Sequence, residues 1–512
     1  MQVLVPYIKP FIGIWLMIVA IHCHGALAQQ NDSNASPRVF TSEHKAKIAG
    51  KSLSYNVTAG ETWLKDDQGQ PTAAIWSTSY VKKGKSKQPR PVTFIYNGGP
   101  GSSSMGLHIG LLGPKIVELP DLVNGDDGVA PYNLIDNPNS LLAVSDLVFV
   151  DPVGTGFSHV IGKGKNQDFW SMSGDTQSMA DFIHQWITDN QRWNAPKHLL
   201  GLSYGTTRAV DVAYFLSANY GIDVNSLMLL GPALEMAALS SVDNNFMAYF
   251  SYVPTMAAVA HFHGKAGQGK TLAEFTAEAE TFVIKELMPA LIMGSRLSKE
   301  QKNQVAQRYA DFTGLSRDYI LKSNLKILIP NYRKELLREQ GFTLGRGDGR
   351  ITGMEYNNAA DSPLIGDPVD YKSSGIYGAS FYQYLSTLGV EMDRKYNAWN
   401  TQVGKYWDWS PDIKAYSNPQ RYRVAKRVGI IEVGSKLGKL MRWNTDLDVF
   451  VASGWYDLVT PLFDTKRTFS SNGIVPERVN IHHYSSGHRL WLDVPTQSEL
   501  LNDLTNFYQV SE

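Results

Sequence analysis

A serine lies between two glycines at residues 201–205, which read Gly-Leu-Ser-Tyr-Gly. This G-x-S-x-G pattern follows an apolar run at residues 198–200 and precedes residues 206–219, which are predicted to form a helix. A strand, a tight turn and a helix form the setting in which enzymes expose a nucleophilic serine, and larger side chains than glycine would clash in that turn. An ordinary Gly-Ser turn is the alternative. The context favours Ser203 as a nucleophile.

A serine hydroxyl is a weak nucleophile, so it needs a base to take its proton and a carboxylate to orient that base. With an elbow of this kind the chain order is serine, acid, histidine. Asp457 follows the apolar run at residues 447–451, at the carboxyl end of a predicted strand, where catalytic loops lie. Asp446, Asp448 and Asp464 are alternatives, but the first two flank or lie in the strand and the third falls in a predicted helix. Asp457 is the predicted orienting carboxylate.

The predicted base is His488, in a loop after the alternating apolar and polar residues 479–484. His482 and His483 are the alternatives. Both lie within the predicted strand, where a histidine is more often a packed or exposed strand residue. The position of His488 in a loop after a strand favours it as the partner of Asp457.

A glycine-rich loop at residues 97–104, Asn-Gly-Gly-Pro-Gly-Ser-Ser-Ser, follows the predicted strand 92–96. Glycines leave backbone amides open to a ligand, and the second N–H of an oxyanion hole comes from this position. We assign the predicted hole to the N–H groups of Gly99 and Tyr204. A phosphate-binding loop is the alternative, but no Walker lysine follows and the spacing does not match a dinucleotide fingerprint.

Short apolar runs in the first half of the chain predict the framework for these residues. The runs lie at residues 92–96, 147–150, 198–200 and 227–230. Continuous apolar runs are typical of strands buried on both faces, and residues 175–190 have helical spacing between the second run and the third. The sequence therefore predicts an α/β fold with a mostly parallel central sheet and helices on both faces. Antiparallel strands at residues 51–58 and 72–80 are predicted to begin it.

Composition divides the rest of the chain. A polar stretch at residues 29–42 precedes the first predicted strand, and residues 29–234 form the N-terminal part of the predicted core. Helix-like patterns replace the short apolar runs from about residue 235 to 421, which predicts a helical insertion that caps the sheet. Residues 422–512 return to the sheet pattern and end in a predicted helix at residues 500–508.

The bulk composition limits the class of protein. Of 512 residues, 43% are hydrophobic and 19% charged, which is typical of a globular protein. The formal net charge of +0 offers no electrostatic footprint for nucleic acid, so nucleic acid is not an expected partner. The basic run at residues 82–87 is predicted to be a solvated hairpin loop. No Cys-type metal motif and no His-Glu-x-x-His occurs, and no metal or cofactor is expected.

The N-terminal residues 1–28 have the layout of a secretory signal peptide. Lys9 is the only charge before the apolar residues 11–21, and residues 26–28, Ala-Leu-Ala, form an A-x-A cleavage site. A membrane anchor is the alternative, but the apolar stretch is short for a span, so we expect no stable membrane insertion after cleavage. The only cysteine, Cys23, lies inside the signal. A disulfide-free exported chain indicates a secreted or periplasmic bacterial protein.

Five motifs, taken together, resemble the serine carboxypeptidase family, peptidase family S10. They occur in order across most of the predicted mature chain, at residues 97–103, 151–158 (Asp-Pro-Val-Gly-Thr-Gly-Phe-Ser), 201–205, 454–457 (Gly-x-x-Asp) and 487–488 (Gly-His). The resemblance implies an α/β-hydrolase fold with a helical cap, and release of C-terminal amino acids through an acyl-enzyme on Ser203. It also implies that Asn97 and Gly98 bind the terminal carboxylate of a peptide.

The chain departs from this family at the acids that help to bind the carboxylate. Many members have a Glu immediately before the nucleophile, where this chain has Leu202, and a second Glu where it has Leu111 or a non-acidic neighbour. Ser102 stands where a cysteine is often found. In the family, the protonated carboxyls favour activity at acidic pH. This chain lacks them, so we expect a pH optimum near neutral, where a histidine base is unprotonated.

An esterase or acyltransferase with the same triad, and a non-catalytic binding protein of this fold, are the alternative functions.

Arg489, directly after His488, is a predicted replacement for the missing acids. A guanidinium binds a carboxylate through two hydrogen bonds and keeps its charge at any working pH. The alternative is a surface arginine that pairs with a local acid such as Asp493.

The expected partner of the site is a peptide or small acyl substrate, and the sequence predicts no oligomeric state.

Overall fold

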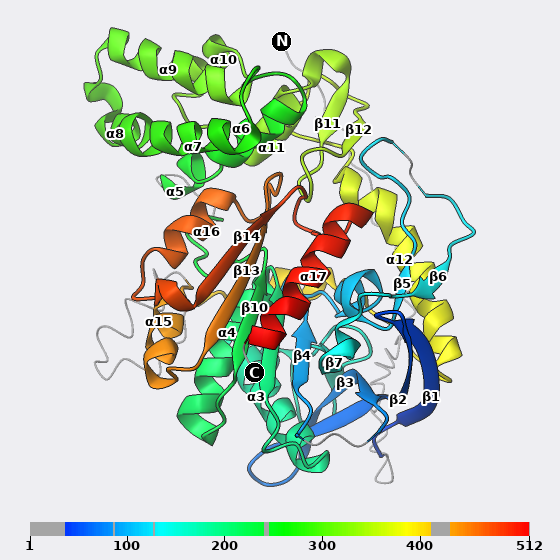
Figure 1. Cartoon of the computed structure of the whole chain (residues 1–512). Coiled ribbons are helices and arrows are strands. Elements are labelled where there is room, and N and C mark those ends of the chain that lie inside the picture. Colours follow the sequence, from blue (N-terminus) through cyan, green and yellow to red (C-terminus); the bar gives the residue numbers. More distant parts are fainter. Residues whose placement is uncertain (1–35, 85–87, 126–127, 240–244, 411–430, 511–512) are drawn as a thin grey trace, which may run out of the picture. The chain divides into compact units, whose positions relative to one another are not determined.

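A 10-stranded sheet forms the centre of the described part of the chain (Figure 1). The computed structural model describes residues 36–84, 88–125, 128–239, 245–410 and 431–510. Strands follow the order β1-β2-β3-β7-β4-β9-β10-β13-β14, with β8 paired to β3, and β5-β6 and β11-β12 form two smaller sheets. The strands are β1 (Val39–Ile48), β2 (Lys51–Lys65), β3 (Pro71–Lys82), β4 (Val92–Tyr96), β5 (Lys115–Val117), β6 (Leu134–Asp136), β7 (Asp146–Asp151), β8 (His159–Val160), β9 (Lys197–Leu202), β10 (Ser226–Leu230), β11 (Phe342–Leu344), β12 (Thr352–Met354), β13 (Asp448–Gly454) and β14 (Val479–Tyr484).

The strands from β7 to β14 in this order run parallel to one another. β4, β7, β9 and β10 are buried along their whole length, which explains their continuous apolar sequences. The strands predicted at residues 92–96 and 479–484 coincide with β4 and β14, and the other predicted parallel strands overlap β7, β9, β10 and β13. Because the strands are parallel, the loops at their carboxyl ends meet at one edge of the sheet.

The N-terminal side of the sheet is antiparallel, as β1 pairs with β2, β2 with β3, and β3 with β7. The prediction that strands begin only after the polar stretch at residues 29–42 is wrong, because β1 begins at Val39. This edge strand alternates exposed and partly buried residues over most of its length. It therefore carries few of the apolar residues that make a strand recognisable.

Helices cover the sheet and continue through the insertion. The helices are α1 (Met105–Leu107), α2 (Asn166–Phe169), α3 (Met172–Asp189), α4 (Tyr204–Phe215), α5 (Met247–Phe250), α6 (Val253–Phe262), α7 (Leu272–Phe282), α8 (Met288–Met293), α9 (Lys299–Thr313), α10 (Arg317–Lys322), α11 (Ile329–Glu335), α12 (Pro368–Thr387), α13 (Thr401–Tyr406), α15 (Gly434–Trp443), α16 (Leu462–Phe469) and α17 (Val494–Val510). The predicted helices at residues 175–190 and 500–508 overlap α3 and α17. The one at residues 206–219 overlaps α4 and a π-helical turn, Leu216–Tyr220.

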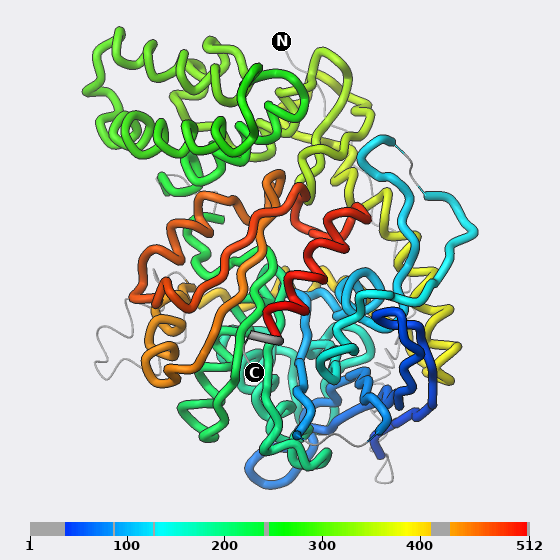
Figure 2. Tube along the Cα trace, in the orientation of Figure 1, coloured from blue at the N-terminus to red at the C-terminus, as the bar shows by residue number. Residues whose placement is uncertain are grey.

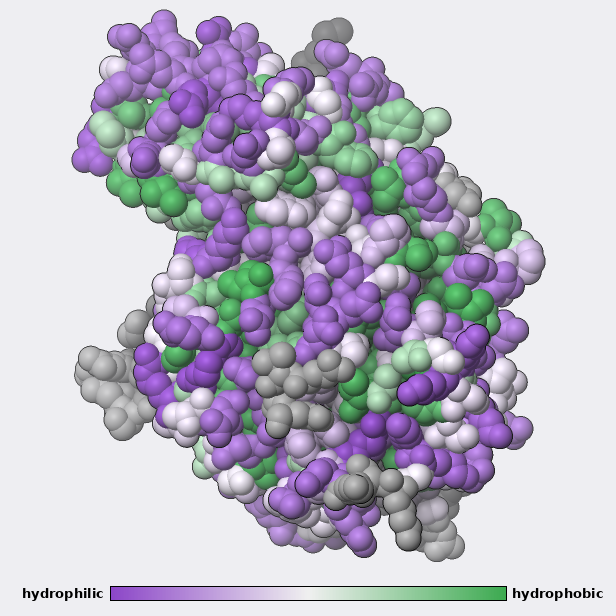
Figure 3. Space-filling view, viewed as in Figure 1, coloured by the Kyte–Doolittle hydropathy of each residue, from purple (hydrophilic) through white to green (hydrophobic). Residues whose placement is uncertain are grey.

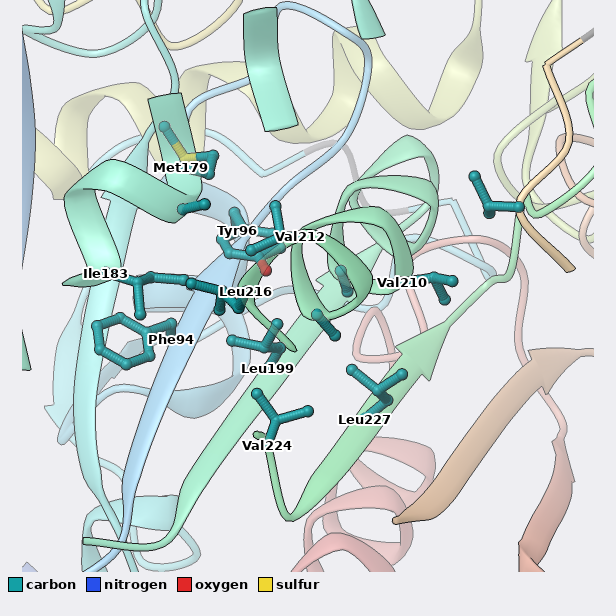
Figure 4. Packing of buried hydrophobic residues seen from close by; sticks show 14 of the residues in the cluster. Phe94, Tyr96, Met179, Ile183, Leu199, Val210, Val212, Leu216, Val224 and Leu227 are labelled. Atoms are coloured by element: carbon teal, nitrogen blue, oxygen red, sulfur yellow. The ribbon is translucent and has the colours of Figure 1, made fainter. Parts of the chain in front are cut away.

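One face of the sheet packs against α3, α4 and α15. Met179 and Ile183 of α3 and Val212 of α4 lie in one buried cluster with Phe94 and Leu199 of the strands (Figure 4). Full burial of each such side chain stabilises the fold by about 1.5–3 kcal/mol. This packing fixes α4, and therefore the turn that precedes it, against β9.

The opposite face packs against α17 and α12. Leu500 and Leu504 of α17 and Phe381 of α12 share a buried cluster with Met228 and Phe450 of the strands. Helices on both faces of a mostly parallel sheet confirm the predicted fold class. Helix α12 falls within the predicted cap of residues 235–421, yet it packs on the sheet because its apolar residues face that layer. The predicted boundary at residue 421 lies outside the described residues.

The insertion has a buried core of its own. Helices α5 to α11 form it together with β11 (Figure 2). Its apolar cluster also includes Tyr456 and Leu458, which follow β13. The insertion therefore packs directly on a loop at the carboxyl edge of the sheet.

The predicted signal peptide, residues 1–28, lies outside the described residues, as do residues 85–87 of the basic run. The chain from Pro37 onward belongs to one unit, Pro37–Glu512. Among the helices that the structure describes, none is both long and apolar enough to cross a membrane. The face of the molecule in Figure 3 is mostly hydrophilic, with apolar residues in scattered groups.

Candidate active site

The turn between β9 and α4, here called the nucleophile loop, presents Ser203 in a strained backbone conformation. Its φ is 60° and its ψ is −130°, values that side chains other than glycine rarely adopt. The N–H of Ser203 donates to the Leu230 carbonyl at 2.9 Å, and the N–H and Oγ1 of Thr206 donate to the Ser203 carbonyl at 2.8 and 2.7 Å. A Cβ atom at Gly201 or Gly205 would collide with backbone atoms, so both positions need glycine. The loop has the geometry of a nucleophile elbow.

Asp457 lies just after β13 with 0% of its surface exposed. Its Oδ1 accepts hydrogen bonds from the N–H groups of Val459 and Thr460, at 2.7 and 2.9 Å. Its Oδ2 accepts from the Thr460 hydroxyl at 2.6 Å and lies 2.8 Å from Nδ1 of His488. A buried carboxylate must be hydrogen-bonded to be tolerated, and these bonds fix its plane toward the histidine. Sequence reasoning missed Thr460, although its position three residues after an aspartate is typical of a carboxylate-capped turn.

His488 belongs to a loop after β14, residues 485–489, here called the base loop. With Nδ1 directed at Asp457, a proton on Nδ1 leaves Nε2 to accept another. The Thr460 hydroxyl lies 3.2 Å from the same Nδ1. A Cβ atom at Gly231 would lie 3.1 Å from Nδ1 and Cε1 of this ring, so glycine leaves room for the imidazole.

The end of β10 separates the two loops. Leu230, its last residue, accepts the N–H of Ser203, and Gly231, the next residue, borders the ring of His488. β9, β10, β13 and β14 are adjacent parallel strands. The sheet therefore brings Ser203, Asp457 and His488 to one edge.

The alternatives considered for the acid and the base have other partners. His482 lies 3.4 Å from Asp503, and the ring of His483 packs near a tryptophan. Asp464 lies in α16, as the sequence predicts, and pairs with Arg467 at 2.7 Å. No group of three or more His, Cys, Asp or Glu side chains able to hold a metal occurs within the described residues.

The glycine-rich loop after β4 lies against the nucleophile loop. A Cβ atom on Gly98 would lie 2.5 Å from the nitrogen of Tyr204, so only glycine permits this approach. Gly99 has a φ of +110°, which glycine adopts without strain. The two predicted oxyanion donors, Gly99 and Tyr204, therefore lie on adjoining loops. The end of the loop is fixed because the N–H and hydroxyl of Ser104 each donate to Oδ1 of Asp151 at 2.7 Å.

Asp151, the first residue of the motif at residues 151–158, is a buried acid. Burial raises its pKa to about 6, and the hydrogen bonds from Ser104 act in the opposite direction. A Cβ atom on Gly156 would collide with the Asp151 carboxylate, which accounts for glycine there. Among the described residues Asp151 makes no ion pair, so hydrogen bonds alone hold the glycine-rich loop to it.

Arg208 of α4 supports the same loop from inside the core, and sequence reasoning missed it. Its Nε donates to Asp175 at 2.8 Å, and its Nη1 donates to the Asn97 carbonyl at 2.5 Å. Its guanidinium also lies 5.2 Å from the centroid of the Tyr204 ring. Asp175 and Asn97 are 33 and 111 residues away along the chain, so spacing gives no signal of this contact.

Arg489, the predicted carboxylate ligand, contacts α12. Its Nη1 donates to the Ser373 hydroxyl at 2.8 Å, and its Nη2 pairs with Asp370. Asp370 is 60% exposed, which leaves this ion pair open to solvent. The local acid considered in the sequence, Asp493, pairs instead with Arg350 at 3.1 Å.

A chain of contacts leads from Arg489 back to the glycine-rich loop. Burial raises the pKa of Tyr377 to about 12, and the charge of Arg489 acts in the opposite direction, so the two groups are close. The Tyr377 hydroxyl accepts from Nε1 of Trp491 at 2.7 Å. A Cβ atom on Gly106 would lie 3.6 Å from Trp491 and 3.3 Å from Nδ2 of Asn97. Buried side chains therefore connect the surroundings of Arg489 with those of Asn97.

The two positions at which the family carries acids are apolar in the structure as well. Leu202, 4% exposed, and Leu111, 0% exposed, belong to the same buried cluster. No carboxyl is available from either position.

A family model described as serine carboxypeptidase matches residues 77–263. The match includes the glycine-rich loop, the motif at residues 151–158 and the nucleophile loop. Over residues 77–263 the chain is therefore similar to the serine carboxypeptidase family. Asp457 and His488 lie beyond the matched residues, so their assignment rests on the geometry described above.

Several solved structures are similar to this chain. KEX1(Δ)p, a prohormone-processing carboxypeptidase from Saccharomyces cerevisiae, is 15% identical, with 88% of this chain and 91% of that chain covered and a TM-score of 0.54. A proline iminopeptidase from Mycobacterium smegmatis is 13% identical, with 88% and 98% covered and a TM-score of 0.35. A putative aryl esterase from Burkholderia cenocepacia is 11% identical, with the same coverage and TM-score. Among curated proteins none matches the chain. The first likeness confirms the α/β-hydrolase fold.

Proposed function

We propose that this protein is a serine carboxypeptidase, which hydrolyses the C-terminal peptide bond of its substrate through an acyl-enzyme on Ser203. His488 acts as the base and Asp457 orients it. The observation that carries the proposal is the 2.8 Å contact between Nδ1 of His488 and Oδ2 of Asp457, beside a strained nucleophile elbow. Ser203 stays partly exposed, as a group that must meet a substrate has to be.

The proposed reaction begins when Oγ of Ser203 attacks the scissile carbonyl carbon and its proton passes to Nε2 of His488. The carbonyl π electrons move to the oxygen, and the N–H groups of Gly99 and Tyr204 stabilise that oxyanion. When the intermediate collapses, the C–N bond breaks and Nε2 gives its proton to the leaving amine. Water then attacks the acyl ester by the same steps, which releases the shortened peptide and restores the serine.

The substrate's terminal carboxylate is proposed to bind at Asn97, Gly98 and Arg489. The Oδ1 atom of Asn97 is buried and has no hydrogen-bond partner within the described part of the chain. An amide with an unused polar atom is suited to a ligand. Arg489 supplies a permanent positive charge, and Ser373 and Asp370 hold its guanidinium.

A comparison of blocked dipeptides with free and amidated C-termini tests the proposal. We expect turnover of the free acid, little turnover of the amide, and labelling of Ser203 by a fluorophosphonate probe. Ser203→Ala, which keeps the fold, is the control and should remove both signals. Folded wild-type protein that does not react with the probe would overturn the proposed chemistry.

A second candidate is an esterase or acyltransferase that uses the same triad. The two leucines at the family's acidic positions, Leu111 and Leu202, favour it, since an apolar cluster does not select a carboxylate. Equal rates on free and amidated dipeptides, or faster turnover of a simple ester, would support this candidate over the exopeptidase. Folded protein without any turnover would support the third alternative, a non-catalytic binding protein.

Export from the cell is proposed on the sequence of residues 1–28, with a secreted or periplasmic location after cleavage. Mass spectrometry of the protein from the culture medium and the periplasm tests this. A mature N-terminus at residue 29 is the expected result, and an intact residue 1 in a cytoplasmic fraction would contradict it.

A further inference from the structure

A short loop of the insertion, residues 345–350 (Gly-Arg-Gly-Asp-Gly-Arg), connects β11 to β12 and is here called the clamp loop. It contacts the base loop directly. The N–H of His488 donates to the Gly347 carbonyl at 2.5 Å, and the N–H of Gly487 donates to Oδ2 of Asp348 at 2.9 Å. Nη1 of Arg350 donates to the Ser485 carbonyl at 2.7 Å. Three backbone groups of the base loop are therefore satisfied by the insertion and not by the sheet.

A buried ion pair holds the clamp loop in shape. Nε of Arg350 donates to Oδ1 of Asp348 at 3.0 Å, and Nη2 donates to Oδ2 at 2.8 Å, so the contact is bidentate. Asp348 is 0% exposed and Arg350 is 7% exposed. Such a pair keeps its geometry because either charge alone would be buried without compensation. Nη2 of Arg350 reaches Asp493 as well, at 3.1 Å.

The clamp loop also contacts the loop that carries the orienting acid. The N–H of Gly349 donates to the Tyr456 carbonyl at 2.9 Å, and the Arg350 guanidinium lies 5.0 Å from the centroid of the Tyr456 ring. Tyr456 directly precedes Asp457. The N–H of Tyr456 donates in turn to the Ser486 carbonyl at 3.0 Å. The insertion thus joins the loops of acid and base.

Close packing leaves the base loop little freedom at this contact. A Cβ atom on Gly487 would lie 2.5 Å from the Cα of Asp348 and would collide with the Gly347 carbonyl. The backbone just before His488 is therefore pressed against the clamp loop. A shift of the clamp loop must move the imidazole relative to Asp457 and Ser203.

We propose that Asp348 and Arg350 are positioning residues for catalysis, which set the orientation of His488 through the backbone of the base loop. The proposal rests on the proposed function, since it assigns the supports of that base. It gives the clamp loop of the insertion a role in positioning the base, beyond that of a cover over the sheet. A displacement of about 1 Å at a catalytic group costs on the order of a hundredfold in rate.

A second buried ion pair of the insertion supplies a matched control. Lys334 and Glu355 lie 3.3 Å apart with 0% of either side chain exposed. Lys334 donates to the Asn357 carbonyl, and Glu355 accepts from the Thr343 hydroxyl and from the N–H of Leu364, so none of these bonds reaches the base loop. A variant of this pair disturbs the insertion without breaking a contact to His488.

The test compares Asp348→Asn, Arg350→Met and Arg350→Lys with Glu355→Gln in the full chain. The measurements are kcat and KM on a blocked dipeptide, the rate of fluorophosphonate labelling, and the melting temperature. We expect Asp348→Asn and Arg350→Met to lower kcat and the labelling rate between about tenfold and a hundredfold, with KM changed less than about twofold. Arg350→Lys keeps the charge and should recover part of the rate. Glu355→Gln should keep kcat at any temperature where it is folded.

Two results would overturn the proposal. One is wild-type kcat in folded Asp348→Asn, and the other is an equal loss of kcat in Asp348→Asn and Glu355→Gln. If Asp348→Asn does not fold, Arg350→Lys decides, because unchanged labelling in that folded variant contradicts the proposal. Failure of the proposed function would be distinct, since wild-type protein would then not react with the probe.

Discussion

At the nucleophile loop, the contacts that fix Ser203 come from Thr206, three residues along the chain, and from Leu230 on the next strand. At the base loop, Gly487 and Ser485 bind Asp348 and Arg350, at separations of 139 and 135 residues. The nucleophile loop is a turn between a strand and the helix that follows it, while the base loop depends on the clamp loop of the insertion. The nucleophile is therefore placed by its own segment and the neighbouring strand, whereas the base also depends on the insertion.

The largest expected effect on kcat comes from removing Ser203 or His488, because the two side chains act as one catalytic unit. Ser203→Ala and His488→Ala should each lower kcat by about a million-fold, because neither residue works without the other. The double variant should be no slower than either single one. Steady-state kinetics on a blocked dipeptide measures this, and losses that multiply in the double variant would show that the two loops act independently.

Removal of the link between acid and base should cost less. Asp457→Asn keeps the shape of the side chain but disturbs the proton arrangement on Nδ1 of His488, so we expect kcat to fall by about ten-thousand-fold. Thr460→Val removes one hydrogen bond to Asp457 and should lower kcat about tenfold. The two kcat values are compared at one pH. Equal losses would mean that Thr460, and not the carboxylate, orients the base.

The next prediction concerns Arg489, the last residue of the base loop, and its effect on KM. Arg489→Met should raise KM for a peptide with a free C-terminus by about tenfold, because one charge-assisted contact is lost. Turnover of an uncharged ester should not change. Asp370→Asn, which frees the guanidinium, is the matched control and should keep KM or lower it. An equal loss on the ester would show that Arg489 serves the fold and not the substrate.

Next in size is the pH response of the nucleophile loop. The wild-type rate should peak near neutral pH, because a histidine base must be unprotonated and Leu202 supplies no acid to bind the substrate. Leu202→Glu places a carboxyl in an apolar cluster, where the neutral form is favoured. Its pH–rate profile, or its preference for free C-termini, should shift. A wild-type optimum in the acid range, or a variant with an unchanged profile and preference, would contradict this.

The smallest expected effect is on the free energy of unfolding. It concerns the buried acids that hold the glycine-rich loop and the clamp loop. The glycine-rich loop beside the nucleophile loop is held by Asp151, which makes no ion pair with any residue that the structure describes, whereas the clamp loop is held by the Asp348–Arg350 pair. Because the folded pKa of Asp151 is raised from 3.8 to about 6, its contribution to stability is full below pH 3.8 and is lost as pH rises through 6. Relative to Asp151→Asn, the wild type should lose about 2 kcal/mol between pH 4 and pH 7. Denaturant unfolding at both pH values measures this, and a constant difference would contradict the raised pKa.

Sequence patterns located the parallel part of the fold because a strand buried on both faces has a continuous apolar sequence. Residues 92–96 and 479–484 coincide with β4 and β14. The same reasoning missed β1, whose residues are mostly exposed at the edge of the sheet. It also assigned α12 to the cap, because a helical pattern shows that one face is buried but not which layer buries it.

The residues of the candidate site also fall into two groups, those that local sequence signals predict and those that only packing brings together. Ser203, Asp457 and His488 could be named from the sequence, since an elbow and loops after strands are local signals with a fixed chain order. Arg208 could not, because its contacts with Asp175 and Asn97 depend on how α3, α4 and β4 pack together. No spacing rule connects residues whose partners are chosen by packing.

The sequence by itself predicted a serine nucleophile and determined the parallel sheet that carries Ser203, because glycine requirements and apolar runs act within a few residues. Only the tertiary structure decided what holds the base. Asp493 follows Arg489 closely in sequence, yet it pairs with Arg350 of the insertion, while Arg489 pairs with Asp370 of α12. Ion pairs form where packing brings charges together, and that choice is made by the whole fold.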